Sequence, residues 1–482
     1  MIASYRERTS LCAYWLMLLL VGTSAAEGTG QHPATTVSFA AETQSAVSSE
    51  EESVALTLSA ALALALRQSP HLAAFTWDIR AADGMIEQAG LRPNPEFSIG
   101  IEQETDSGFG DSEITISIAQ PILLGRKRAK RLAVAETVKG LVLLDYRAAR
   151  ANVLAQTAVD FVEVLAGQEY VSLDQELVEL AEEVARSFSL RVDAGQVSPL
   201  ELSRAEVALT TARLGYEDSL RALEAARATL ASNWGGKRAM FAQVVGCLEE
   251  IRPVPALEEL VALVTRNPDL ARWSTELAAR RAEFTLERAE RIPDLTAELG
   301  LRSAVVDDLN APRYGFGSAG DFAFARGESE YGVDRGNGLV LGFSLPLPIF
   351  NRNQGRIAAA EAMVRKVSDQ RRSAEAAVHA ELASAYQAAS GAYAKAQTLS
   401  DEVMPKVDET FEKIQRGYRH GKFSYLEVLD TQRTLFDARE AYLDALTRYH
   451  QGVVRMERLT GQGLEDARPR DESDMEEFSN GK

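Results

Sequence analysis

The sequence is poor in the residues that form covalent cross-links and tight metal sites. It has 2 cysteines and 5 histidines in 482 residues. Cys12 lies in the N-terminal segment that we predict to be removed, so Cys247 is the one cysteine of the mature chain and no intramolecular disulfide is possible. The histidines are scattered, and none stands at metal-ligand spacing from another. We therefore expect no disulfide framework, no bound metal and no cofactor.

Basic residues are also in short supply. The formal net charge is −18. Nucleic-acid backbones are bound by clustered Lys and Arg, so this balance argues against a nucleic-acid partner. Hydrophobic residues make up 46% of the chain and charged residues 25%. A large core is therefore expected, and disorder of the whole chain is excluded.

Long apolar runs are absent, apart from a short one near the N-terminus. That run covers residues 11–21, well below the roughly 20 residues that span a bilayer as a helix. Arg6 and Arg8 precede it, and the small residues 24–26 follow it. This order of charge, apolar run and small residues predicts a secretory signal peptide over residues 1–26.

Two polar segments border the rest of the chain. Residues 27–53 are rich in Ser, Thr, Ala, Gly and Glu without periodicity, which predicts a flexible leader. Residues 464–482 are predicted to be an acidic disordered tail. Cys12 does not lie at the predicted cleavage point, so it cannot be the lipid-carrying cysteine of a lipoprotein.

The segment between these ends repeats itself. GQVSPLELSRAEVALTTARLGYEDSL (195–220) aligns without gaps with GKFSYLEVLDTQRTLFDAREAYLDAL (421–446). Two shorter pairs follow in the same order in both halves, 67–75 with 265–273 and 131–136 with 356–361. We interpret this as an internal duplication, with repeats at 54–245 and 246–463 and a Gly- and Pro-rich join near 235–255.

Each repeat is predicted to contain a helix pair, two strands and two long helices. The helix pairs are expected at about 57–90 and 256–290. The long helices carry apolar residues at alternating spacings of three and four, as in a coiled coil. One such stripe is Leu173, Leu177, Leu180 and Val184. The run from about 126 to 190 has no proline and no helix-breaking cluster, and as one helix it would be roughly 100 Å long.

The predicted strands alternate apolar and polar residues. Phe97, Ile99 and Ile101 have polar or small neighbours, and the same period recurs at 114–119, 295–302 and 339–345. A small soluble sheet would show this pattern, but in an exported chain it also suits a membrane barrel. Four strands cannot close a barrel, since about eight are needed, and open edges are not tolerated in lipid. We therefore expect a cyclic homotrimer that shares one 12-stranded barrel, with 303–337 as an outward loop.

Several segments resemble the TolC-like outer-membrane efflux family. They are QPILLGRKRAKRLAVAE (120–136), RVDAGQVSPLEL (191–202) and GYRHGKFSYLEVLDTQR (417–433). FSLPLPIFNRNQGRIAAAEA (343–362) is similar to the CzcC-type cation-efflux branch. The resemblance implies a mixed α and β membrane protein, in which the trimeric barrel crosses the outer membrane and an α-helical tunnel extends into the periplasm. It also implies a passive duct rather than an enzyme, with a periplasmic adaptor and an inner-membrane pump as partners.

The resemblance also implies a gate at the periplasmic entrance. By motif position Tyr418 matches the gate tyrosine, Glu427 and Asp430 match two acids that ring the entrance, and Glu201 matches the acid of the other hairpin. Without the resemblance, Glu427 and Asp430 would be interpreted as a solvated helix face.

One position departs from the family pattern. Phe423 stands where the best-known members have the basic residue that pairs with the gate acids. Arg419, Lys422 and Arg433 are the nearest replacements, and the sequence does not choose among them.

The two hairpin turns are the predicted contact with the adaptor. Gly195 and Gly421 mark the turns, and Ser198 and Ser424 follow them at matching positions. Glycine permits backbone conformations that a side chain forbids, which suits an exposed tip.

The function predicted from the sequence is an efflux duct for metal cations. Two alternatives stay open. One is the same channel exporting organic compounds or proteins, and the other is a soluble periplasmic coiled-coil scaffold without a barrel.

Overall fold

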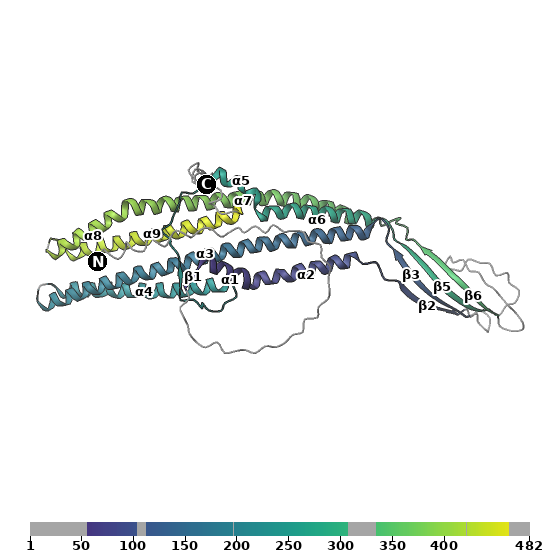
Figure 1. The fold of residues 1–482 in the computed structure, drawn as a ribbon, viewed down its shortest axis with the longest axis horizontal. Coiled ribbons are helices and arrows are strands. Elements are labelled where there is room, and N and C mark those ends of the chain that lie inside the picture. Colours follow the sequence, from purple (N-terminus) through teal and green to yellow (C-terminus); the bar gives the residue numbers. More distant parts are fainter. Residues whose placement is uncertain (1–54, 104–111, 196, 307–333, 421, 462–482) are drawn as a thin grey trace, which may run out of the picture. The chain divides into compact units, whose positions relative to one another are not determined.

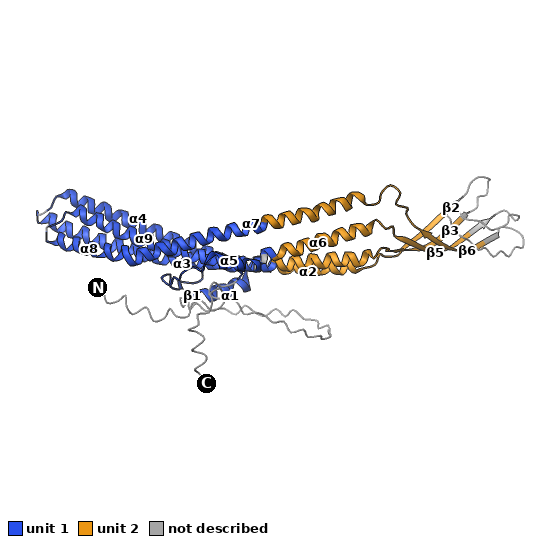
Figure 2. Cartoon of the chain, turned by 90° about the horizontal axis from the view of Figure 1, so that it is seen from above, with its two compact units in different colours: residues 1–74, 146–270, 374–482 blue, residues 75–145, 271–373 orange. Residues whose placement is uncertain are grey.

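The computed structural model describes residues 55–103, 112–195, 197–306, 334–420 and 422–461. The predicted signal, leader and tail lie outside this range, as does most of the predicted loop. The chain forms two compact units, coloured separately in Figure 2. Unit 1 comprises residues 1–74, 146–270 and 374–482, and unit 2 comprises residues 75–145 and 271–373. Each unit draws on both halves of the sequence.

Unit 1 is built from long helices (Figure 1). Its elements are α1 (Leu58–Gln68), most of α3 (Lys127–Asp193), α4 (Pro199–Ser232), α5 (Leu257–Leu263), η1 (Val264–Arg266), the end of α7 (Gln354–Thr398), η2 (Leu399–Val403), α8 (Met404–Arg419) and α9 (Tyr425–Thr460). Helix α3 has 67 residues and is therefore about 100 Å long, as predicted. Among the described residues, no helix is both long enough and apolar enough to span a membrane.

The first long helix of the second repeat is interrupted, although the sequence predicted one continuous helix there. The π-helical segment η2 separates α7 from α8. Pro405 stands in the first turn of α8. A proline ring clashes with the carbonyl group four residues earlier and removes one helical hydrogen bond. That carbonyl belongs to Asp401, inside η2, where the wider π turn can accommodate the ring.

A short parallel strand pair, which the sequence analysis did not predict, lies in unit 1. β1 (Ala55–Thr57) pairs with β4 (Gln243–Val245), inside the predicted join. The Gln168 side chain of α3 satisfies the backbone of β4: Val244 N–H donates to Oε1 at 2.8 Å, and Nε2 donates to the Val244 carbonyl at 3.0 Å. The apolar core beside this pair includes Phe161, Leu230 and Leu446.

Unit 2 contains an antiparallel sheet and parts of long helices. The strands β2 (Glu96–Gln103), β3 (Ser112–Ile122), β5 (Leu295–Val306) and β6 (Asp334–Ser344) are ordered β2-β3-β5-β6. The helices α2 (Pro70–Gly90) and α6 (Pro268–Glu290) lead into β2 and β5. The predicted loop 303–337 was too long, because its first four residues belong to β5 and its last four to β6.

The two faces of the sheet differ as the alternation predicted. Apolar side chains on one face are exposed, among them Ile101 at 73% and Phe343 at 75%. Polar groups pair on the other face, where the Ser98 and Ser117 hydroxyls lie 2.7 Å apart and Arg302 pairs with Glu113. In the described part of the chain, the outer strand β2 pairs with β3 and the outer strand β6 pairs with β5.

A buried lysine joins the strand ends to the helices of unit 2. Lys127, at the start of α3, is 3% exposed. Its Nζ lies 2.9 Å from Asp294 and 3.3 Å from Glu290. The other oxygen of Asp294 accepts the Leu124 N–H at 3.0 Å. The turn that enters α3 is thereby fixed to the turn between α6 and β5.

Candidate functional site

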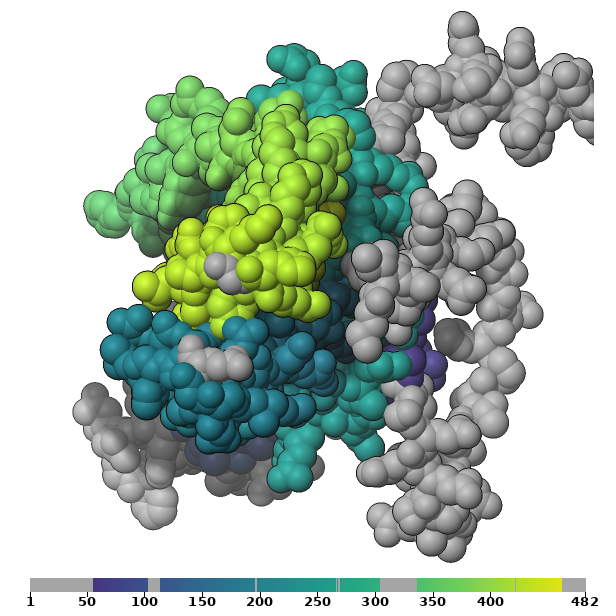
Figure 3. Space-filling model, turned by 90° about the vertical axis from the view of Figure 1, so that its left-hand side faces the viewer, coloured from purple at the N-terminus to yellow at the C-terminus, as the bar shows by residue number. Residues whose placement is uncertain are grey.

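The predicted site residues lie at the ends of two helical hairpins in unit 1. Helices α3 and α4 form the first hairpin, and α8 and α9 form the second (Figure 1). Their ends pack against each other, blue-teal below yellow-green in Figure 3. One apolar cluster draws buried side chains from both hairpins: Phe188, Ala205, Tyr425 and Val428. Residues from two segments far apart in the sequence therefore form one cluster at the ends of the hairpins, which we call the tip cluster.

Three aromatic rings form the centre of the tip cluster. Phe188 of α3 is 1% exposed, and its ring centre lies 4.3 Å from that of Tyr425 and 6.2 Å from that of Tyr418. Burial raises the pKa of Tyr425 to about 12. Within the described part of the chain, the buried Tyr425 hydroxyl has no hydrogen-bond partner. The three rings therefore hold the two hairpins together mainly through apolar contact.

A cation reinforces this contact between the hairpins. Arg191 Nη1 of α3 donates a hydrogen bond to the Tyr418 hydroxyl at 3.0 Å, and its guanidinium carbon lies 5.0 Å from the ring centre. Burial raises the pKa of Tyr418, and the charge of Arg191 opposes that rise. Arg191 was not among the predicted site residues. It stands in the 191–202 segment, but its partner is distant in sequence and no local pattern links the two.

The acid of the first hairpin lies near the aromatic rings. Glu201 is half-buried in the first turn of α4. Burial is the main cause of the raised pKa of Tyr418 and of Tyr425, and the charge of Glu201 raises both pKa values further. The structure thus brings together Tyr418 and Glu201, two of the predicted gate residues.

The acids of the second hairpin lie differently. Glu427 and Asp430 are exposed on the first turns of α9, three residues apart and so on neighbouring positions of one face. Glu427 also caps its own helix: Ser424 N–H donates to Oε2 at 2.7 Å, and the Ser424 hydroxyl donates to the same oxygen at 2.8 Å. These hydrogen bonds lower the pKa of Glu427.

The two serines after the turns are helix caps. Ser424 Oγ accepts the Glu427 N–H at 3.4 Å, which completes a capping box. Ser198 Oγ accepts the Leu200 N–H at 3.3 Å at the start of α4. The Ser-x-x-Glu spacing in both hairpins is the known signature of this cap, a signal that the sequence analysis did not use.

Phe423 packs back onto its own hairpin. Its ring lies against Gly417 of α8, so that a side chain at Gly417 would collide with it. The Phe423 side chain nevertheless remains 39% exposed. Of the proposed basic substitutes, Arg433 lies 3.8 Å from Asp437 on its own helix. Arg419 and Lys422 are exposed as well, and the choice among the three stays open.

The first turn has the backbone that glycine favours. Gly195 has φ +68°, and open space surrounds the position of an added Cβ. A side chain at Gly195 would thus be opposed by backbone strain rather than by a neighbour. Gly421 lies outside the described residues.

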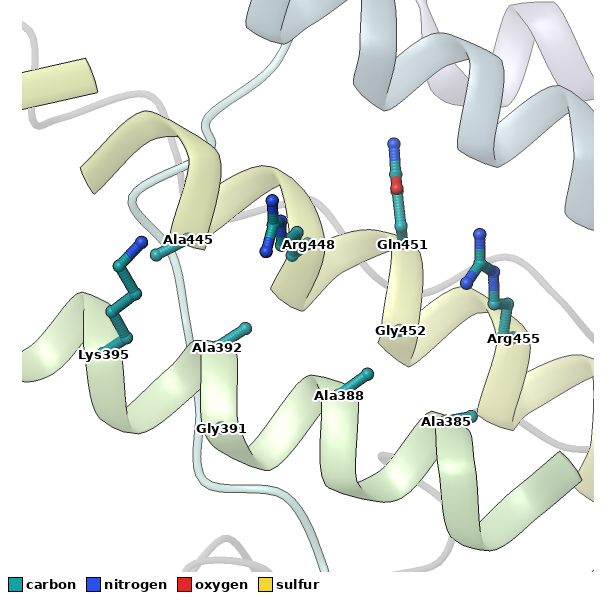
Figure 4. Close-up of a pocket in the computed structure, with 10 residues that line it drawn as sticks. All are labelled: Ala385, Ala388, Gly391, Ala392, Lys395, Ala445, Arg448, Gln451, Gly452 and Arg455. Atoms are coloured by element: carbon teal, nitrogen blue, oxygen red, sulfur yellow. The ribbon is translucent and has the colours of Figure 1, made fainter. Parts of the chain in front are cut away.

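A groove of 470 Å³ lies between α7 and α9 (Figure 4). Its floor consists of alanines and glycines, because the helices approach closely: a Cβ on Gly452 would meet the Cβ of Ala389 at 2.8 Å. Long polar side chains rim it, namely Lys395, Arg448, Gln451 and Arg455. Asp444 lies 2.9 Å from Arg448 and 3.7 Å from Lys395. Two of the cations thus share one carboxylate.

Metal-ligating side chains are dispersed in the described residues. No group of three or more His, Cys, Asp or Glu side chains there could hold a metal ion. His450 instead lies 2.9 Å from the Leu248 carbonyl, and burial lowers its pKa.

Comparison with known proteins identifies the fold and the family. The family model described as outer membrane efflux protein matches residues 61–236 and 260–462. The cobalt-zinc-cadmium resistance protein CzcC of Cupriavidus metallidurans is 33% identical over 406 residues, which cover 84% of this chain and 90% of CzcC. The nickel and cobalt resistance protein CnrC of the same organism is 25% identical over 300 residues, 61% of this chain and 64% of CnrC.

A solved structure gives the same answer for the fold. A CusC structure, described in terms of transmembrane channel formation, superposes with a TM-score of 0.68 at 16% identity and covers 84% of this chain and 92% of that one. The chain therefore has the fold of the TolC-like channels, and it belongs to the outer membrane efflux protein family.

Proposed function

We propose that this chain is the outer-membrane channel subunit of a tripartite efflux pump, a passive exit duct for heavy-metal cations. Family membership supports the channel, and the similarity to CzcC and CnrC, named for metal resistance, supports the cargo. The observation that carries the proposal is that one chain of this family combines a sheet with an exposed apolar face and two helical hairpins that meet in a tip cluster.

The sheet supports a trimer. Its apolar face is exposed, and among the described residues β2 and β6 each pair with one strand. Unpaired strand edges are too costly in lipid, and about eight strands are the least that close a barrel. We propose that three copies contribute four strands each to one 12-stranded barrel.

The order of elements supports an internal duplication. In each half a helix pair is followed by two strands and a long hairpin. We propose that the repeats cover 54–245 and 246–463. We further propose export by a signal peptide over residues 1–26, an outer-membrane barrel that is not anchored through Cys12, and a helical extension into the periplasm.

The tip cluster is the proposed gate. Threefold symmetry would turn Glu427 and Asp430 into rings of carboxylates at the entrance, which attract cations. Tyr418, held by Arg191 and flanked by Glu201, would keep the second hairpin against the first while the entrance is closed. Opening would then require the hairpins of one chain to separate.

The hairpin turns are the proposed adaptor contact. Gly195 and Gly421 mark these turns, and Ser198 and Ser424 fix the helices that leave them. An inner-membrane pump would supply the energy, so the chain itself would need neither nucleotide nor catalysis. Bulky substitutions at both glycines should abolish efflux and leave the trimer intact.

Metal resistance in cells tests the proposal. A strain that keeps its pump and adaptor but lacks this chain should be sensitive to divalent cations, and the full chain should restore resistance. The unchanged chain should remain in outer-membrane fractions after a carbonate wash. Release by carbonate would favour the scaffold alternative. Restored resistance to organic compounds without resistance to metals would favour the other cargo.

A further inference from the structure

Each connection between the sheet and the helices of unit 2 carries an exposed arginine. The strand register places the start of β2, the end of β3, the start of β5 and the end of β6 at the same end of the sheet. Arg92 precedes β2, Arg126 follows β3, Arg291 precedes β5 and Arg352 follows β6. The chain as a whole has a net charge of −18. An acidic chain thus presents cations at one end of its sheet.

Two of these arginines line one hollow. Arg291 and Arg352 border a depression of 340 Å³ at the start of α7, together with Gln354, Ile357, Ala358 and Glu361. Arg352 Nε donates a hydrogen bond to the Pro348 carbonyl at 3.2 Å, which orients its guanidinium group. Within the described residues, neither Arg291 nor Arg352 forms an ion pair with a carboxylate. The hollow therefore presents two cations that the described part of the chain does not neutralise.

The carboxylates near the hollow already have cationic partners. Glu361, in the wall of the hollow, lies 2.7 Å from Arg365 Nη2 on its own helix. Glu290 and Asp294, which flank Arg291 in the sequence, both pair with the buried Lys127. An anion that neutralises Arg291 and Arg352 must therefore come from outside the described chain.

Exposed apolar side chains lead from the sheet to the hollow. The alternation on the exposed face of β6 continues beyond the strand with Leu345 and Leu347, the latter 72% exposed. Ile349 and Phe350 follow, and Phe350 is 90% exposed. Gln354 Nε2 donates a hydrogen bond to the Phe350 carbonyl at 3.2 Å, which ties this loop to the start of α7. A large aromatic side chain held out in this way indicates an apolar environment at the mouth of the hollow.

We propose that this hollow binds the phosphate of an anionic phospholipid, whose acyl chains lie along the apolar side chains of residues 345–350. The proposal rests on the membrane barrel proposed above and adds a lipid-binding site to it. The apolar face of the sheet would lie in hydrocarbon, so the end that carries the four connections comes to the level of the headgroups.

The residue types fit this ligand. A guanidinium group binds a phosphate through two parallel hydrogen bonds, a geometry that lysine does not offer. The headgroup of a zwitterionic lipid carries its own cation beside the phosphate, whereas an anionic headgroup leaves its charge to the two arginines. The hollow therefore favours an anionic lipid, as basic sites at a membrane surface do.

Tryptophan quenching by brominated lipids tests the proposal on the full chain in vesicles. Phe350→Trp places a fluorophore beside the hollow, at an exposed position where folding should tolerate it. The emission of the unchanged chain is subtracted. Both vesicles contain phosphatidylcholine with the same minor fraction of phosphatidylglycerol and the same amount of brominated lipid. The brominated lipid is phosphatidylglycerol in one vesicle and phosphatidylcholine in the other. We expect a preference of about tenfold or more for phosphatidylglycerol.

Substitutions of the arginines separate the headgroup site from general contact with lipid. Arg291→Gln with Arg352→Gln should reduce the preference to about one, because an amide does not neutralise a phosphate. Arg291→Gln alone leaves the hydrogen bond from Arg352 to the loop intact and should reduce the preference by about fivefold. Arg372→Gln is the matched control, since Arg372 is an exposed arginine of the same helix that pairs with Asp369. It should leave the preference unchanged.

Four results would overturn the proposal. Equal quenching by the two lipids would show apolar contact without a headgroup site. A preference that the double variant retains would assign it to other cations. Loss of the preference in inorganic phosphate, but not in chloride at the same ionic strength, would make the hollow a site for free phosphate. Absence of quenching in a chain that conducts in planar bilayers would contradict the lipid site alone, whereas a chain that carbonate removes from the vesicles would contradict the proposed channel as well.

Discussion

The contact between Arg191 and Tyr418 allows a graded test of the proposed gate. Tyr418→Phe removes the hydroxyl that accepts the hydrogen bond at 3.0 Å and keeps the ring beneath the guanidinium. Arg191→Met removes both interactions and keeps an apolar stem. A half-exposed hydrogen bond from a charged donor contributes about 1 kcal/mol, and a cation over an exposed ring adds about 0.5–1 kcal/mol.

These contributions predict an order of opening. Tyr418→Phe should favour separated hairpins by about fivefold, and Arg191→Met by about tenfold to thirtyfold. The assay is the fraction of time that single channels spend open in planar bilayers. Arg416→Met is the matched control, because Arg416 pairs with Glu412 on its own helix in an exposed ion pair of little energetic value. Equal open fractions in Arg191→Met, Tyr418→Phe and the unchanged chain would refute the reasoning.

Other contacts give sharper tests of the fold, each by thermal unfolding. Gly452→Ala forces a Cβ against Ala389 and should lower the free energy of unfolding by about 1–3 kcal/mol. Gly391→Ala on the facing helix meets open space and should raise the free energy of unfolding by about 0.5–1 kcal/mol. Equal effects of the two substitutions would contradict the close approach of α7 and α9. Lys127→Met leaves two partly exposed carboxylates without their cation and should cost about 2–3 kcal/mol, less than for a fully buried pair. No loss of stability would contradict a stabilising role of these two ion pairs. Burial lowers the pKa of His450 below its ordinary 6.5, so the folded state favours the neutral ring, and stability should fall as the pH drops below that value. His450→Gln should flatten this dependence, and an unchanged pH profile would assign it to other groups.

The parts of the fold that follow local periods were predictable from the sequence. The period of two in segments such as 97–101 predicted the strands, and which of their side chains share the exposed face. The absence of proline and of helix-breaking clusters between about 126 and 190 predicted the length of α3. Both signals arise because the side-chain direction repeats with the backbone, so no distant residue is needed to interpret them.

The missed features depend on contacts between distant residues. The three-residue strand β4 is held by Gln168 from a helix 76 residues earlier in the chain. Arg191 reaches Tyr418 across 227 residues. The π segment before Pro405 was missed for a different reason: helical periodicity continues through it, and only the proline marks the place.

Conductance of the purified chain in planar bilayers tests the central claim most directly. We expect a trimer that carries stepwise, cation-selective currents without nucleotide or any other energy source. Replacing both Glu427 and Asp430 with Ala should weaken that selectivity and the block by multivalent cations, because the proposed carboxylate rings are lost. Absence of current steps from a properly inserted trimer would contradict the channel. Unchanged selectivity and block in the double variant would place these carboxylates outside the conducting path.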